Sequence, residues 1–136
     1  MKQMTQHEMR KIAMQAVYMA NQDQNLTPQA ALESVCRTFE IKEIPQYSQT
    51  IVSGVLSERT ALDEKLSQKL KSGWQLSRLD QIDRAILEIG LYEIESSQII
   101  QPVSAVNEAL NLCDEFSEPK SKQFVNGVLA NFVPKD

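Results

Sequence analysis

The sequence predicts an all-α fold, and three observations carry that prediction. Apolar residues recur every three or four positions along most of the chain, which is the spacing of one helix face. No stretch alternates apolar and polar residues in the way that half-buried strands do. The 136 residues include only four glycines and five prolines, and most of the prolines stand where a helical pattern begins. A single domain of this length can bury a core without a metal or disulfides.

The first two helices are predicted from their start signals. Thr5 and Glu8 have the spacing of a capping box, which starts a helix that runs to about Ala20. Thr27 is a good N-cap and is followed by Pro28 at the first helical position, so a second helix begins there. The buried faces are expected to consist of Met9, Ile12, Ala13, Ala16 and Val17 in the first helix and Ala31, Leu32, Val35, Cys36 and Phe39 in the second.

One long third helix is predicted from Pro45 to Ser72, where Gly73 supplies a helix end. Lys69 and Lys71 fall in its last turn, where the helix dipole favours positive charge. A short helical turn is expected after the tryptophan that follows. The apolar stripe of the long helix comprises Ile51, Val52, Val55, Leu56, Leu62, Leu66 and Leu70.

Three further helical segments complete the chain. Asp80 is expected to cap a helix over residues 81–96, whose apolar residues point in nearly every direction, as in a central helix. Pro102 begins the next helix, and the last one begins near Pro119 or Ser121. The inward residues of the helix after Pro102 are expected to be Val103, Val106, Ala109, Leu110 and Cys113.

The last helix contains Gly127, preceded by an asparagine, and this dipeptide is typical of tight β-hairpin turns. Phe124 and Val128 nevertheless keep a four-residue spacing, so we predict a helix that runs through the glycine. Glycine in a helix interior costs roughly 1 kcal/mol relative to alanine. Because Gly54, Gly90 and Gly127 all lie within apolar stripes, we expect each to admit a neighbouring helix backbone.

Charge is unevenly distributed along the chain. The formal net charge is −4, which argues against a general nucleic-acid coat protein. No Lys or Arg occurs between Ala85 and Pro119, whereas basic residues gather near the N-terminus and just before the last apolar stripe. The pattern indicates one weakly basic surface and one acidic surface suited to a basic partner, although ordinary solvated helix faces would also produce it.

The cysteine and histidine content predicts neither a metal site nor any other cofactor site. Cys36 and Cys113 are far apart in the sequence, and each lies among apolar residues at helical spacing, so both are expected to be buried, reduced thiols. His7 is the only histidine. No apolar run approaches the roughly 20 residues that span a membrane, and no secretory segment is recognisable. We therefore expect a cytoplasmic protein without membrane partners.

Short motifs along nearly the whole chain carry a family resemblance. They are Ala13-x-Gln15-Ala16-x-Tyr18, Trp74, Asp83-Arg-Ala-Ile-Leu-x-x-Gly-x-Tyr92-Glu93, Asn107-Glu108-Ala109 and Phe124-Val-Asn-Gly-Val-Leu129. Each motif alone is weak, but their order and spacing in a chain of this length are specific. In these residues the chain resembles the NusB family of bacterial transcription antitermination factors.

The resemblance implies one domain over residues 1–136, built of about seven helices in two small bundles. It implies a factor that binds boxA RNA of nascent transcripts, especially those of ribosomal RNA operons, as a heterodimer with ribosomal protein NusE. RNA polymerase elongation complexes with other Nus factors are the implied setting, and a homodimer is a further state found in the family. No catalysis is implied, and the sequence contains no nucleophile–base pair or phosphate-binding glycine loop.

The family's RNA surface combines a basic N-terminal segment with the start of the last helix. The corresponding residues here are Lys2, Arg10, Lys11, Tyr18, Lys120, Lys122, Gln123 and Phe124. An arginine-rich run common in the family is replaced by QMTQHEMRK, which predicts weaker RNA binding with a shallower salt dependence. Phe124 can stack on an unpaired base or pack in the core. Tyr18 can lie near the place where the family's protein and RNA surfaces meet or be a core tyrosine, and the cations can contact phosphate or be merely solvated.

The partner surface implied by the family includes Tyr18, Asp83, Arg84 and Glu93. Asp83 can instead serve the capping arrangement of Asp80, and Glu93 belongs to an acidic run that would attract a basic partner. Two other functions remain in view. One is an RNA-targeting domain of a ribosomal RNA cytosine methyltransferase, which needs a further domain, and the other is a helical scaffold without an RNA role.

Overall fold

The computed structural model describes residues 4–135, and this part of the chain contains seven α-helices, two short 3₁₀ helices and no strand. The chain divides into two compact units, of which the first ends at Ser57 and the second begins at Glu58. These findings confirm the predicted all-α class with its two helical bundles. None of the helices in the described residues is long and apolar enough to cross a membrane.

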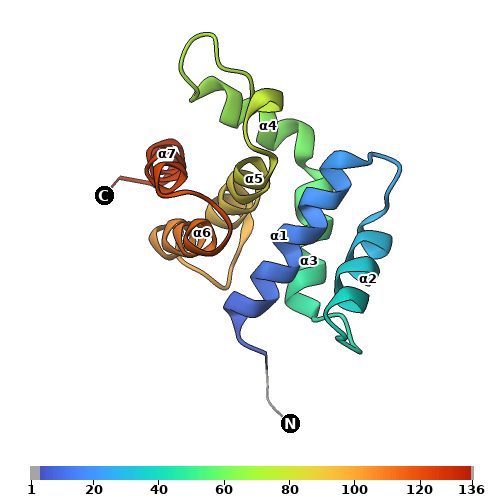
Figure 1. The fold of residues 1–136 in the computed structure, drawn as a ribbon. Helices are drawn as coiled ribbons and strands as arrows, with labels where there is room; N and C mark the ends of the chain where they lie inside the picture. Colours follow the sequence, from blue (N-terminus) through green and yellow to red (C-terminus); the bar gives the residue numbers. More distant parts are fainter. Residues whose placement is uncertain (1–3, 136) are drawn as a thin grey trace. The chain divides into compact units, whose positions relative to one another are not determined.

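The first unit is a bundle of three helices, α1 (Gln6–Gln22), α2 (Pro28–Thr38) and α3 (Gln46–Ser57), with α1 packed against both of the others (Figure 1). Both predicted start signals are present. Thr5 and Glu8 form the capping box, and the Thr27 hydroxyl accepts a hydrogen bond from the Ala30 amide at 3.1 Å. Small residues of α1, such as Ala13 and Ala16, are fully buried and allow close packing of the bundle.

Phe39 does not join the core, contrary to the prediction. It caps the C-terminus of α2 and is 52% exposed. Glu40 has a φ of 57°, in the left-handed region, and this turn directs the chain away from the helix. The apolar spacing in the sequence therefore extends to Phe39, one residue beyond Thr38, where α2 ends.

The predicted long third helix is two helices, α3 and α4 (Arg59–Gln68), separated by Glu58. Apolar residues of α3 pack against α1 and α2, whereas those of α4 pack against α5 in the second unit. Val55 and Leu62 are seven residues apart and keep the same helical phase on both sides of the break. Because no glycine or proline marks the break, periodicity alone could not reveal it. The helix also ends earlier than predicted, at Gln68.

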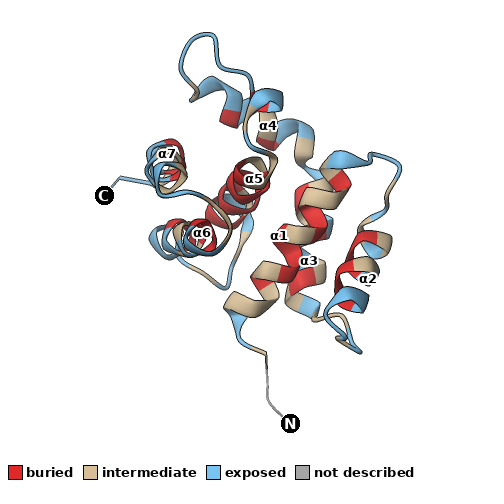
Figure 2. Cartoon of the chain, in the orientation of Figure 1, coloured by how far each residue is buried: buried red, intermediate tan, exposed pale blue. Residues whose placement is uncertain are grey.

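The second unit surrounds helix α5 (Gln81–Ser96), which packs against α4, α6 (Pro102–Phe116) and α7 (Pro119–Leu129). Burial extends almost all round α5, while α6 and α7 each keep an exposed face (Figure 2). The short 3₁₀ helices η1 (Leu76–Arg78) and η2 (Ala130–Phe132) complete the unit. Asp80 caps α5 as predicted, but Val103 is 61% exposed, so its predicted inward position is wrong.

Gly90 and Gly127, for which the sequence supported the same prediction, have different surroundings. A Cβ atom on Gly90 would lie 2.6 Å from Cδ1 of Leu129 and 3.5 Å from Cβ of Ala109, so Gly90 permits the close packing of α5 on its neighbours. A Cβ atom on Gly127 would have no neighbour within 4 Å. The predicted helix–helix contact at Gly127 is therefore wrong, although α7 does run through this glycine as predicted.

Both cysteines are free and buried, which confirms the prediction of reduced thiols. Burial raises the pKa of Cys36, and it raises the pKa of Cys113 to about 12 together with the nearby carboxylates of Asp83 and Asp114. Both groups are therefore protonated and unreactive at neutral pH. In the described residues, no cluster of three or more His, Cys, Asp or Glu side chains is arranged to hold a metal ion.

Candidate nucleic-acid interface

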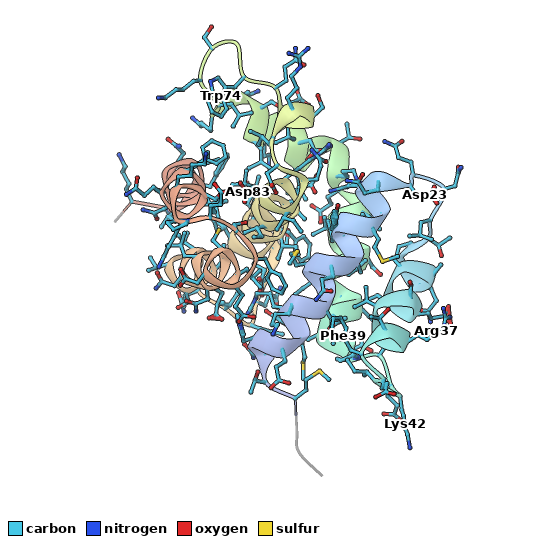
Figure 3. The ribbon with its side chains drawn as sticks, in the orientation of Figure 1. Asp23, Arg37, Phe39, Lys42, Trp74 and Asp83 are labelled. Atoms are coloured by element: carbon cyan, nitrogen blue, oxygen red, sulfur yellow. The ribbon has the colours of Figure 1, made fainter. Side chains whose placement is uncertain are left out.

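An aromatic pair lies at the surface of the second unit. The rings of Trp74 and Phe124 are stacked, with centroids 5.9 Å apart and an angle of 29° between their planes. Trp74 is 55% exposed, and Phe124 is half-buried. Figure 3 shows Trp74 on the loop that leaves α4, beyond the end of α5 that carries Asp83. The pair brings together residues that are 50 positions apart in the sequence, from a loop and a helix.

A tight turn places Trp74 over α7. After α4 ends, the amide of Leu70 donates to the carbonyl of Ser67, and the amide of Trp74 donates to the carbonyl of Lys71 at 3.0 Å. Gly73 has a φ of 89°, which is accessible to glycine but strained for other residues. The loop therefore has a specified backbone conformation that directs the indole toward Phe124.

A groove of about 480 Å³ lies on one side of the aromatic pair. Its lining includes three lysines, Lys69, Lys71 and Lys120, and no carboxylate. No ion pair of Lys69 or Lys71 occurs among residues 4–135. Lys120 is 3.5 Å from the Glu118 carboxylate, but both side chains are so exposed that this pair contributes little and can exchange partners. The groove is thus locally basic in a chain whose net charge is −4.

A second hollow of about 560 Å³ shares Trp74, Phe124 and Lys120 with the groove. Its other charged lining residues are Arg78, Asp80 and Asp83, so its charge is mixed. The aromatic pair therefore has a basic hollow and a mixed hollow next to it. Of the two, the basic groove is better suited to a phosphate-bearing ligand.

Helix α7 presents the groove residues on one face because they are three or four positions apart. Lys120, Gln123, Phe124 and Gly127 all line the groove. Lys122 lies on another face and forms an ion pair with Asp114 of α6, with 3.1 Å between Nζ and Oδ1. The structure thus brings together three of the four residues that the sequence proposed near the start of this helix.

Asp83 holds the start of α7 in place. Its side chain is nearly buried, and its two carboxylate oxygens accept hydrogen bonds from the hydroxyls of Ser117 at 2.6 Å and Ser121 at 2.8 Å. Its amide also donates to the capping carboxylate of Asp80. A buried carboxylate bonded in this way ties α5 to the connection between α6 and α7. Asp83 therefore positions the groove wall, and both of its oxygens already have partners within the unit.

The other two predicted partner residues of α5, Arg84 and Glu93, are also ion-paired within the unit or buried. Arg84 donates to Asp63 of α4 at 3.0 Å and lies 3.5 Å from the Glu88 carboxylate. Glu93 is 1% exposed, so it presents no free carboxylate surface to a partner. The acidic run of α5 that the sequence suggested as a partner surface is in part a buried polar face.

In the first unit, the predicted RNA residues that the structure describes have two different environments. Arg10 is 1% exposed, and its Nη2 donates to the Tyr47 hydroxyl at 2.7 Å, with the guanidinium 5.3 Å from the ring centroid. Both alternatives in the sequence analysis placed Arg10 at the surface, so this burial is a correction. Lys11 and Tyr18 are half-buried, and Lys2 lies outside the described residues.

Sequence reasoning did not single out Lys69, Lys71 and Gly127, which line the groove, and it gave Trp74 no site role. The two lysines were attributed to the helix dipole because the preceding helix was predicted to extend through them. The available signal was a tryptophan directly after the predicted helix end at Gly73, close to two lysines. Its meaning depended on the contact between Trp74 and Phe124, which no local pattern reveals.

Comparisons with known proteins give the family. The NusB family model matches residues 7–134. Transcription antitermination protein NusB of Lacticaseibacillus casei is 40% identical over 129 residues, which cover 95% of this chain and 94% of that protein.

Solved structures have the same fold. NusB of T. maritima aligns with a TM-score of 0.85 and 21% identity, covering 96% of this chain and 92% of that chain. A crystal structure of antitermination factors NusB and NusE in complex with dsRNA aligns with a TM-score of 0.80 and 21% identity, covering 95% of this chain and 97% of that chain. Because the family model matches residues 7–134 and the fold is shared with solved NusB structures, this chain belongs to the NusB family.

Proposed function

We propose that this chain is a transcription antitermination factor that binds boxA RNA of nascent transcripts, including those of ribosomal RNA operons, as a heterodimer with ribosomal protein NusE. The observation that carries the proposal is the surface pair of Trp74 and Phe124 next to a groove lined by Lys69, Lys71 and Lys120 in a member of the NusB family. Exposed aromatic rings beside cations are the usual means of binding single-stranded RNA. The name of the L. casei relative and the NusB–NusE–dsRNA complex support the same function.

In this proposal both units act as one module over residues 1–136. Lys120, Gln123 and Phe124 contact RNA directly, Lys11 and Tyr18 contribute from the first unit, and Lys122 contributes only general positive charge. Asp83, Arg84 and Glu93 influence NusE binding through the packing of α5, because their side chains are used within the fold. RNA polymerase elongation complexes in the cytoplasm are the proposed site of action, without catalysis by this chain.

Fluorescence anisotropy of a labelled boxA RNA tests the proposal. The RNA is titrated with this protein alone and with equimolar NusE, at two salt concentrations, and a scrambled RNA serves as the control. We expect tighter, salt-sensitive binding to boxA in the presence of NusE. If neither boxA nor scrambled RNA binds to the folded protein or to the mixture, the function is a scaffold without an RNA role.

Self-association is measured in parallel, because a homodimer is a further proposed state of the chain. Sedimentation velocity at the concentrations of the binding assay gives the fraction of dimer. RNA that dissociates the dimer would mean that the two interactions use the same surface.

A further inference from the structure

We propose that the groove formed by loop residues 69–74 and the exposed face of α7 holds one unpaired RNA nucleotide, with its base against Trp74 and its phosphates near the lysines. The inference rests on the proposed function and specifies a subsite for it. Three independent features of the groove support this assignment: the exposed indole, the positive charge of a lining without carboxylates, and the glycine on its α7 wall.

The first feature is the exposure of the indole. Trp74 is the only tryptophan of the chain, yet 55% of it is exposed to solvent. Its ring is held against Phe124 by the turn at Gly73 and not left free on a mobile side chain. A preorganised ring loses little conformational entropy when a ligand stacks on it. The pair therefore has the properties of a stacking platform for a flat, unpaired base.

The second feature is the charge of the lining. Lys69, Lys71 and Lys120 converge on one groove that has no carboxylate, whereas the adjacent hollow contains two. Lys69 and Lys71 have no ion-pair partner among residues 4–135, so no internal salt bridge must break before they attract phosphate, and the pair of Lys120 with Glu118 is exposed and weak. Together, the lysines and the aromatic pair favour a ligand that combines a planar apolar group with negative charge.

The third feature is Gly127. Glycine in a helix interior is unfavourable by about 1 kcal/mol relative to alanine, and no packing contact at Gly127 explains that loss, since the space beside it is empty. Gly127 lines the groove next to Gln123 and Val128. The absence of a side chain on this wall therefore makes room for a ligand and not for another helix.

An acidic protein segment is the competing occupant. It would satisfy the lysines but would leave the stacked aromatic pair without a planar partner. A nucleotide satisfies both features at once, and for that reason we assign the groove to RNA. Binding of NusE alone, measured with the same variants, separates the two occupants.

Filling the groove is the first test. Gly127→Leu places a large side chain at an exposed helical site, and Asn126→Leu introduces the same side chain on the neighbouring exposed residue, which does not line the groove. Circular dichroism confirms that both variants are folded. In the heterodimer with NusE, we expect Gly127→Leu to lower boxA RNA affinity at least about 10-fold, the loss of one stacked base, and Asn126→Leu to lower it less than about 2-fold.

Removing the platform is the second test. Trp74→Ala is expected to lower RNA affinity about 5- to 150-fold, whereas Phe39→Ala, at an exposed aromatic residue of the first unit, should leave it unchanged. RNAs with one abasic position each are then compared on the wild type and on Trp74→Ala. One abasic position should weaken binding to the wild type and have no further effect on Trp74→Ala.

The outcomes separate the subsite from the function. If the wild type binds boxA RNA and both Gly127→Leu and Trp74→Ala bind it equally well, the subsite is wrong and the proposed function stands. If these variants lose affinity for NusE alone, the groove is a protein-binding surface and the subsite is again wrong. If the wild type binds no RNA with or without NusE, the proposed function is wrong, and so is the subsite that rests on it.

Discussion

The two basic segments of this chain differ in what the fold does with their charge. Near the N-terminus, Arg10 is buried and bonded to the Tyr47 hydroxyl. In the second unit, Lys69, Lys71 and Lys120 stay exposed around a groove with an aromatic pair. Arg10 lies in phase with the buried face of α1, while the lysines lie where helices end or begin. The position of each cation relative to the buried helix face therefore decides whether it is available to a ligand.

Removing Arg10 is expected to have the largest effect among the variants that test this difference between the two segments. We expect Arg10→Ala to lower the free energy of unfolding by about 2–3 kcal/mol, because it deletes a charged, buried hydrogen bond and leaves the Tyr47 hydroxyl without its donor. Urea denaturation followed by circular dichroism measures the change. Lys11→Gln removes the same charge from the next residue, which is only half-buried, and should cost less than about 0.5 kcal/mol. Equal losses in the two variants would show that Arg10 has no special structural role.

The two helical glycines of the second unit, Gly90 and Gly127, provide the next largest effect. Gly90→Ala should destabilise the protein by about 1 kcal/mol, since overpacking against the buried Leu129 side chain exceeds the gain in helix propensity. Gly127→Ala should stabilise it by about 0.5–1 kcal/mol, because the added methyl group meets no atom. Both are measured by urea denaturation. A loss of stability in Gly127→Ala would mean that Gly127 is a packing residue after all.

Alkaline pH tests the buried interior of the second unit. The pKa of Cys113 is about 12 in the folded chain, above its ordinary value of 9.0, and burial, followed by Glu58 and Glu93, also raises the pKa of Tyr92. The unfolded chain then releases protons first as pH rises. The contribution of the Cys113 thiol to the free energy of unfolding is therefore fully present below pH 9. It decreases between about pH 9 and pH 12, by about 1 kcal/mol at pH 10. Urea denaturation at pH 8 and pH 10 measures the loss, which should become smaller in Cys113→Ala.

The smallest effect on stability is expected at the exposed lysines, where the change lies in RNA binding. Lys120→Gln should leave the urea midpoint unchanged and reduce the slope of log affinity against log salt by about 0.7, the value for one phosphate contact with a single strand. Lys122→Gln should change this slope less, because Lys122 pairs with Asp114 outside the groove. Anisotropy titrations at several salt concentrations give both slopes. Identical slopes for the two variants would contradict the specific role of Lys120.

The sequence alone determined much about this protein. Helix starts at Thr5, Thr27, Asp80 and Pro102 were correct because caps and N-terminal prolines act locally. The family also followed from spaced motifs. The buried thiols followed from the apolar phase of their helices.

Only the tertiary structure decided the rest. The break at Glu58 depends on which core each half of a continuous stripe packs against, and both halves have the same phase. The open space beside Gly127, the contact of Trp74 with Phe124 and the use of Asp83 as a clamp all depend on residues distant in the sequence. Local propensity governs where a helix starts. Which side chains remain free to bind is set by the neighbours that the fold brings to them, and those neighbours are not encoded in any short stretch.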